Sequence, residues 1–140
     1  MRREFPKNFN PQKETCMREF STGAARGTDK NKPDYEGYLS PIVLERFSRY
    51  MMKHQRQVDG KLRDSDNWQK GIPLDAYMKS MWRHFMDVWF LHRFKAEEGN
   101  LNYAQKEALC ALMFNVMGYL HELLKTEQPS KNKINWKAFE

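Results

Sequence analysis

The chain has few of the features that mark disulfide-built, exported or membrane-spanning proteins. It contains two cysteines, Cys16 and Cys110, in 140 residues. The first lies in a predicted tail and the second inside a predicted helix, so we expect no structural disulfide. Thiols that stay reduced are typical of a reducing compartment, and the sequence therefore predicts a cytoplasmic protein.

Long hydrophobic runs are also missing. The longest uncharged run, 108–120, is interrupted by Asn115 and Gly118 and is shorter than the roughly 18 residues that a bilayer-spanning helix needs. The N-terminal residues MRREFPKNFN are basic but contain no apolar segment of the signal-peptide kind. We therefore expect no membrane span and no export signal.

What the chain has in quantity is charge, methionine and aromatic side chains. Hydrophobic residues make up 40% and charged residues 30% of its length, as in a single globular domain with a core of its own. Nine methionines and 14% aromatic residues predict a bulky, irregular interior. The net charge of +6 favours anionic partners such as nucleotides, nucleic acids or acidic proteins. The same excess often serves only to keep a small domain soluble.

Prolines and glycines divide the chain into three parts. Residues 1–38 contain Pro6, Pro11 and Pro33 without helical or strand periodicity, which predicts an extended basic arm. Residues 39–125 show helical periodicity and predict a helical bundle domain. Residues 126–140 form a basic tail. The predicted fold class is all-α, with a bundle of three to four helices.

Local signals give the helix bounds. Ser40 and Pro41 supply an N-cap and a first-turn proline for a helix over 41 to about 57. Pro73 opens a second helix, about 74–94, which carries one wide apolar stripe. A third helix runs from about 102 to 125 and has leucines on one side and small residues on the other. We therefore expect it to be covered on both sides, as the central helix of the bundle.

The segment between Asp59 and Asp87 holds the strongest functional signal. A polar loop with Asn67, Trp68 and Lys70 leads into a helix that carries Arg83, His84 and Asp87. His84 and Asp87 lie one turn apart, which suits joint metal ligation or a phosphate contact.

Each of these residues also has a purely structural explanation. His84 could be a packing residue, and Arg83 and Asp87 could form an ordinary surface salt bridge. Trp68 could stack on a base or simply plug the loop onto the bundle. Lys70 and its basic neighbours Lys61 and Arg63 suit a polyphosphate, or could only solubilise the loop.

Glu107 is the other candidate. It falls on the small-residue side of the third helix, where an ionised carboxylate costs several kcal/mol unless a metal or a cation compensates its charge. Alternatively, Glu107 lies in the wet first turn and only favours the positive end of the helix dipole.

Four stretches of this sequence resemble a known family. They are FSTGAARGTDKNKPDYEGYLSP, RDSDNWQKGIP, YMKSMWRHFMDVWFLHR and EALCALMFNVMGYLHELL. They look like phage and bacterial proteins with a dATP/dGTP diphosphohydrolase N-terminal domain, over roughly residues 18–124. That family is loosely similar to the all-α nucleoside triphosphate pyrophosphatases of the MazG type. If the chain is phage-encoded, the resemblance places it in the host cytoplasm.

The resemblance implies a site and a reaction. The acidic pairs of such enzymes correspond here to His84 with Asp87 and to Glu107 with Cys110, so two of four acids are missing. Asn115, Glu45, Asp64 or Asp66 would have to complete the ligand shell. The implied reaction is hydrolysis of a purine (d)NTP to (d)NMP and pyrophosphate, with Mg²⁺ or alternatively Mn²⁺.

The roles that the resemblance implies can be assigned by residue. Asp87 and Glu107 hold the metal together with His84, which also orients or deprotonates water. Arg83 and Lys70 bind phosphates, while Asn67 and Trp68 contact base or sugar, with Asn115 beside the substrate. Small helical pyrophosphatases of this kind suggest a homo-oligomer. The alternative is a non-catalytic module that binds nucleic acid or protein through its basic arm and tail, or a phage structural protein.

Overall fold

The computed structural model describes residues 17–29, 32–94 and 101–127. It divides into two compact units between Leu39 and Ser40. Each unit is described by itself. None of the helices in the described ranges is both long enough and apolar enough to cross a membrane.

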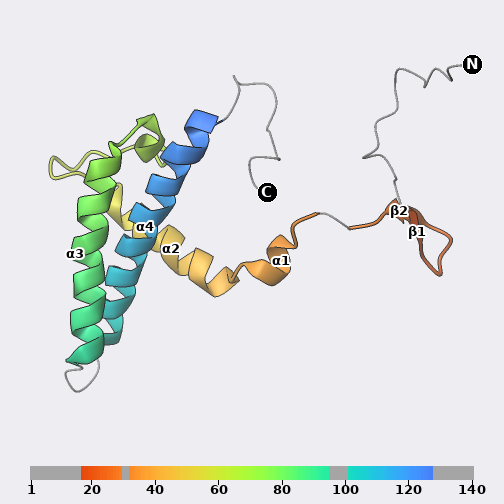
Figure 1. The fold of residues 1–140 in the computed structure, drawn as a ribbon, viewed down its shortest axis with the longest axis horizontal. Helices are drawn as coiled ribbons and strands as arrows, with labels where there is room; N and C mark the ends of the chain where they lie inside the picture. The colour runs from red at the N-terminus through yellow and green to blue at the C-terminus, as the bar shows by residue number, and fades with distance from the viewer. Residues whose placement is uncertain (1–16, 30–31, 95–100, 128–140) are drawn as a thin grey trace, which may run out of the picture. The chain divides into compact units, whose positions relative to one another are not determined.

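The first unit contains short regular elements. Strand β1 (Met17–Glu19) pairs antiparallel with β2 (Ala25–Gly27), with Arg18 opposite Arg26 (Figure 1). Gly23 turns the hairpin with a φ of 83°, which glycine adopts without strain. Helix α1 (Tyr35–Tyr38) follows, capped by the Asp34 carboxylate, which accepts the N–H of Gly37. The aperiodic sequence of this segment did not predict these elements.

The second unit begins with helix α2 (Pro41–His54). The Ser40 hydroxyl oxygen accepts the backbone N–H of Val43 at 3.4 Å, which is the predicted N-cap. The helix ends at His54 rather than near residue 57. The next residues form a tight loop instead, in which Gly60 has a φ of 79° and the backbone N–H of Gln57 donates to the carbonyl of Lys61 at 2.8 Å.

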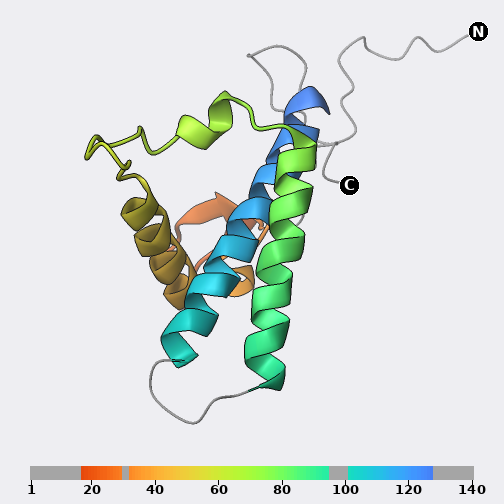
Figure 2. The ribbon, with the colours of Figure 1, turned by 90° about the vertical axis from the view of Figure 1, so that its left-hand side faces the viewer.

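The other elements complete a helical bundle, as predicted. The short 3₁₀ helix η1 (Asn67–Lys70) precedes α3 (Leu74–Arg93), which starts directly after Pro73. Helix α4 (Leu101–Glu127) packs along α3 and also contacts α2. Figure 2 shows α4 between the other two helices. The prediction that this is the central helix is confirmed.

The core lies on the small-residue side of α4. Ala108, Cys110, Ala111 and Asn115 are buried there, and the ring of Tyr77 from α3 packs directly over Gly118. The expectation that both sides of α4 are covered is wrong for the isolated chain. Its leucine side stays half-exposed, because small residues let α3 approach closely and bulky ones do not.

Candidate functional site

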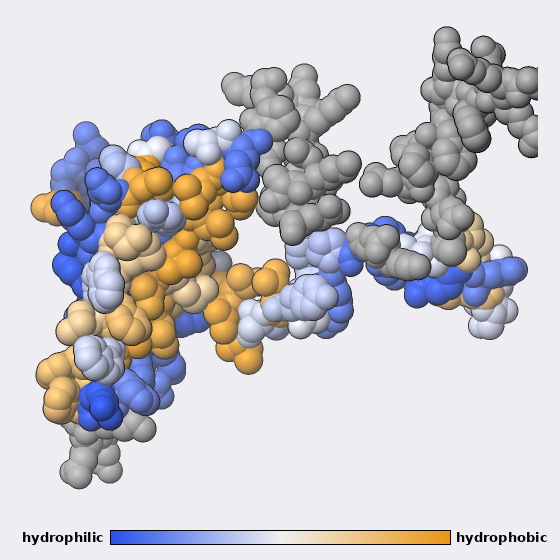
Figure 3. Space-filling view, viewed as in Figure 1, coloured by the Kyte–Doolittle hydropathy of each residue, from blue (hydrophilic) through white to orange (hydrophobic). Residues whose placement is uncertain are grey.

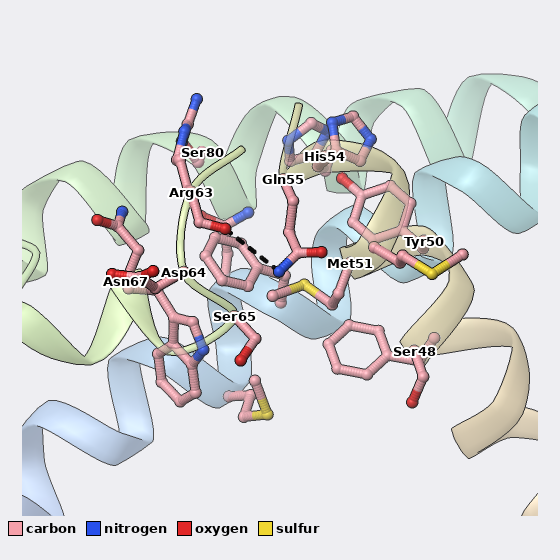
Figure 4. Close-up of a pocket in the computed structure, with 17 residues that line it drawn as sticks. Ser48, Tyr50, Met51, His54, Gln55, Arg63, Asp64, Ser65, Asn67 and Ser80 are labelled. Atoms are coloured by element: carbon pink, nitrogen blue, oxygen red, sulfur yellow. Dashed lines mark hydrogen bonds between the residues drawn. The ribbon is translucent and has the colours of Figure 1, made fainter. Parts of the chain in front are cut away.

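A hollow of about 620 Å³ opens between α2, α3, α4 and the α2–α3 connection (residues 55–73). Figure 4 shows Tyr50 and His54 of α2, with Gln55 directly after it, facing the hollow from one side, and Asp64 and Asn67 of the connection opposite. The only bond drawn there joins the Gln55 amide to the backbone carbonyl of Arg63, at 3.3 Å. This bond fixes one wall of the hollow to the end of α2.

Trp68 anchors the other wall. Its ring packs edge-on against Phe114 and His121 of α4, with centroid distances of 6.2 and 4.9 Å. The Lys125 ammonium donates to the carbonyl of Gln69 at 3.2 Å and ties η1 to the same helix. Trp68 therefore plugs the connection onto the bundle and lines the hollow at the same time, so the two readings of the sequence do not exclude each other.

The predicted polar residues near this wall are partly engaged with one another. Lys70 donates to the side-chain oxygen of Asn67 at 3.2 Å and lies 3.8 Å from Asp64. Asn115 is buried and lines the hollow, and its amide donates to the carbonyl of Ala111 at 2.8 Å. Asn67 and Asn115 thus reach the hollow, whereas Lys70 is not among the residues that line it.

A second hollow of about 480 Å³ adjoins the first. The two share Tyr50, His54 and His84, and the second is also lined by Asp87 and Glu107. The structure therefore brings the three residues expected to be catalytic to one hollow. His54 was missed by the sequence analysis, although it lies on the same face of α2 as Phe47 and Tyr50.

His84 and Asp87 face each other loosely. The Nδ1 atom of His84 lies 3.6 Å from a carboxylate oxygen of Asp87, beyond hydrogen-bonding distance. Asp87 is mostly exposed and His84 half-buried. Arg83 does not form the salt bridge that its i,i+4 spacing to Asp87 suggested, since its guanidinium donates to the Ser80 hydroxyl at 2.8 Å.

Two cations from α2 compensate the charge of Glu107. Arg46 donates to one carboxylate oxygen and Lys53 to the other, the latter at 3.0 Å. The Arg46 guanidinium, aided by Lys53, holds the pKa of Glu107 below its ordinary value although burial acts to raise it. Lys53 also donates to the hydroxyl of Tyr103. The sequence offered a buried Glu107 compensated by a metal or a cation, or a Glu107 in the wet first turn. The structure places it past the first turn of α4, with its side chain 19% exposed, and supplies two cations.

The sequence held a signal for this pairing. Arg46 and Lys53 are seven residues apart, so they share one face of α2. The sequence alone does not indicate which residue this face contacts, because that depends on the packing of α2 beside α4.

The described part of the chain holds no group of three His, Cys, Asp or Glu side chains close enough to bind one metal ion. Glu107 already has a cation on each oxygen. Cys110 is a buried thiol whose pKa is raised by burial, so it stays protonated and is a poor ligand. His84 and Asp87 are the expected ligands that remain available at the hollow.

Comparison with protein-family models, with curated proteins and with solved structures found no match to this chain.

Proposed function

We propose that the chain binds a purine nucleoside triphosphate in the two adjoining hollows and hydrolyses it to the monophosphate and pyrophosphate. The observation that carries the proposal is the larger hollow itself. Its volume of about 620 Å³ falls in the range of small-molecule sites. Polar and charged side chains outnumber the apolar and aromatic ones in its lining, so the hollow offers many hydrogen-bonding groups beside the rings of Trp68 and Phe114.

The base fits the wall formed by Trp68 and Phe114. An indole next to a second aromatic ring offers a stacking surface that accepts a planar purine. The amides of Asn67 and Asn115 line the same hollow and supply donors and acceptors for the base or sugar.

The phosphates fit the junction of the two hollows. His54 and His84 line both of them, and Arg63 lines the larger one. To reach a phosphate, Lys70 has to leave Asn67 and Asp64, and Arg83 has to leave Ser80. The cost is small for Lys70, because exposed ion pairs contribute little.

A divalent metal fits this site at Asp87 but not at Glu107. Mg²⁺ is often bound by one or two carboxylates together with substrate phosphates, and Asp87 is an exposed carboxylate beside the phosphate end. Glu107 would first have to release Arg46 and Lys53. A bound Mg²⁺ or Mn²⁺ would supply charge stabilisation and a water of lowered pKa. His84, next to Asp87, would hold that water or take its proton.

The second candidate is nucleotide or nucleic-acid binding without hydrolysis. The neutralised Glu107 favours it, since a carboxylate held by two cations adds nothing to a metal site. Phage origin, which the resemblance suggests, and cytoplasmic location, which the cysteine usage suggests, remain part of this proposal.

Two measurements test the proposal. Calorimetric titration with dATP, dGTP and dCTP should show purine binding that Trp68→Ala weakens about tenfold, since stacking on an aromatic residue contributes roughly 1–3 kcal/mol per base. Ile42→Ala, a change at an exposed α2 side chain outside both hollows, should leave affinity unchanged. Equal affinity of wild type and Trp68→Ala would refute the site.

Pyrophosphate release with Mg²⁺ or Mn²⁺ then separates the two candidates. Asp87→Asn should abolish release, whereas Glu107→Gln should leave it measurable in whatever fraction stays folded. Purine binding by the wild type with no release under either metal would establish the second candidate instead.

A further inference from the structure

A broad apolar surface covers the side of α3 and α4 that does not line the hollows. We call it the outer face. It consists of Met78, Trp82, Phe85 and Trp89 of α3 with Leu109, Met113, Val116, Leu120 and Leu123 of α4, which are between 36% and 63% exposed. None of these side chains lines either hollow. Figure 3 shows hydrophobic side chains gathered over α4 on this side of the second unit.

The outer face is unusual for a surface in contact with water. A helix at the surface normally buries its apolar stripe and exposes its polar one. Here α4 buries alanine and asparagine, while Leu109, Leu120 and Leu123 are exposed. In the described residues, the only large side chain that is fully buried is Tyr77. The outer face is therefore a substantial apolar surface that a partner could still remove from water.

The size of the outer face fits a protein interface. Nine large side chains that are each about half exposed present on the order of 700 Å² together. A monomeric protein rarely exposes a contiguous apolar patch of this size. A standard interface buries about 800 Å² on each partner.

We propose that the outer face is the contact surface for a second copy of this chain. The face spans two helices that lie side by side, α3 and α4 (Figures 1 and 2). A two-fold axis through such a face places two helix pairs against each other and gives a four-helix arrangement with its apolar residues inside. The chain thereby completes its core with an identical partner.

The charges favour this partner over a nucleic acid. None of the nine side chains is charged, so two copies of a chain of net charge +6 meet there without opposing cations. A nucleic acid needs lysine or arginine on its contact surface to neutralise phosphates. The outer face offers none.

Sedimentation equilibrium of the full chain under reducing conditions tests the proposal. The expected mass is about twice the 16.8 kDa of one chain, and thiol reductant excludes a disulfide-linked pair. The double variant Trp82→Glu with Val116→Glu places a charge on each helix of the face and should weaken self-association at least a hundredfold. The matched control is Ile42→Glu, at an 80% exposed apolar residue of α2 outside the face, and it should remain dimeric.

A second measurement covers the case in which the double variant does not fold. The midpoint of thermal unfolding of the wild type should rise with protein concentration, because mass action stabilises a folded dimer. A folded wild type that sediments as a monomer, with a midpoint independent of concentration, would overturn the proposal. A dimer that the double variant leaves intact would overturn it as well. Neither result bears on nucleotide binding, which uses other residues.

Discussion

Replacing Gly118 with alanine should destabilise the protein, although the opposite is usual in a helix. Gly118 lies in the middle of α4 under the ring of Tyr77. A Cβ atom added there would overlap ring carbons of Tyr77 and lie 2.5 Å from its hydroxyl oxygen. Tyr77 is only 1% exposed, so its ring has no open space into which it could move.

Two opposing effects set the magnitude. Glycine in the interior of a helix costs about 1 kcal/mol relative to alanine, so propensity alone predicts stabilisation. Overpacking a filled core costs typically 1–3 kcal/mol, and overlap with a buried aromatic ring lies at the upper end. We expect a net loss of about 1–2 kcal/mol. For a domain of this size each kcal/mol lowers the unfolding midpoint by roughly 4–8 °C.

The assay is urea unfolding followed by circular dichroism at one fixed protein concentration, with a double-mutant cycle. Tyr77→Leu removes the ring, so Gly118→Ala should become neutral or stabilising in that background. Tyr77→Phe keeps the ring and is the matched control, in which the cost should persist. The Tyr77 hydroxyl has no hydrogen-bond partner among the described residues, so Tyr77→Phe alone should cost little.

The sign of the change decides the outcome. A Gly118→Ala protein that is more stable than the wild type by about 1 kcal/mol would show that the ring does not lie over Gly118. An equal cost in the Tyr77→Leu background would show that the loss has another origin. Either result would refute the proposed packing of α3 on α4.

Three other predictions concern single side chains. Glu107→Gln should lower the free energy of unfolding, measured by urea titration, by roughly 1 kcal/mol near neutral pH. The pKa of Glu107 is lowered in the folded state. The difference from wild type should therefore persist above about pH 5 and vanish as the pH falls through that lowered pKa. In a Cys16→Ser background, Cys110 should react with a thiol reagent only on unfolding, since it is buried and its pKa is raised; rapid labelling of the folded chain would contradict this. Ser40→Ala should cost about 1 kcal/mol by calorimetry through loss of the N-cap bond to Val43, while Ser40→Asp should not.

The sequence predicted the helices well because their signals are local. Ser40 with Pro41, and Pro73, fix two helix starts through the chemistry of the first turn. The hairpin of β1 and β2 was not predicted because its sequence carries no such local signal. Each strand is three residues long and almost wholly exposed, so it carries none of the alternation that marks a strand with a buried face.

The sequence predicted those contacts of the candidate site that join residues close together in the chain, but not those that join distant residues. His84 and Asp87 lie one turn apart on the same helix, and their proximity follows from helical geometry. The partners of Glu107 are 54 and 61 residues away, and no pattern within one helix indicates them. The need for a compensating cation could be argued from burial alone, but its identity depends on how α2 packs against α4.

The orientation of α4 about its own axis links these findings. Both of its sides are apolar, so periodicity did not decide which one is buried, and close packing of Gly118 under Tyr77 did. The same orientation turns Glu107 toward Arg46 and Lys53. It also places Glu107 at the smaller hollow between α2, α3 and α4 and leaves Leu109, Leu120 and Leu123 exposed. The proposed site and the proposed dimer surface, on opposite sides of one helix, thus both follow from how α4 packs. Separating them experimentally therefore requires variants on the outer face that leave Gly118 and Tyr77 unchanged.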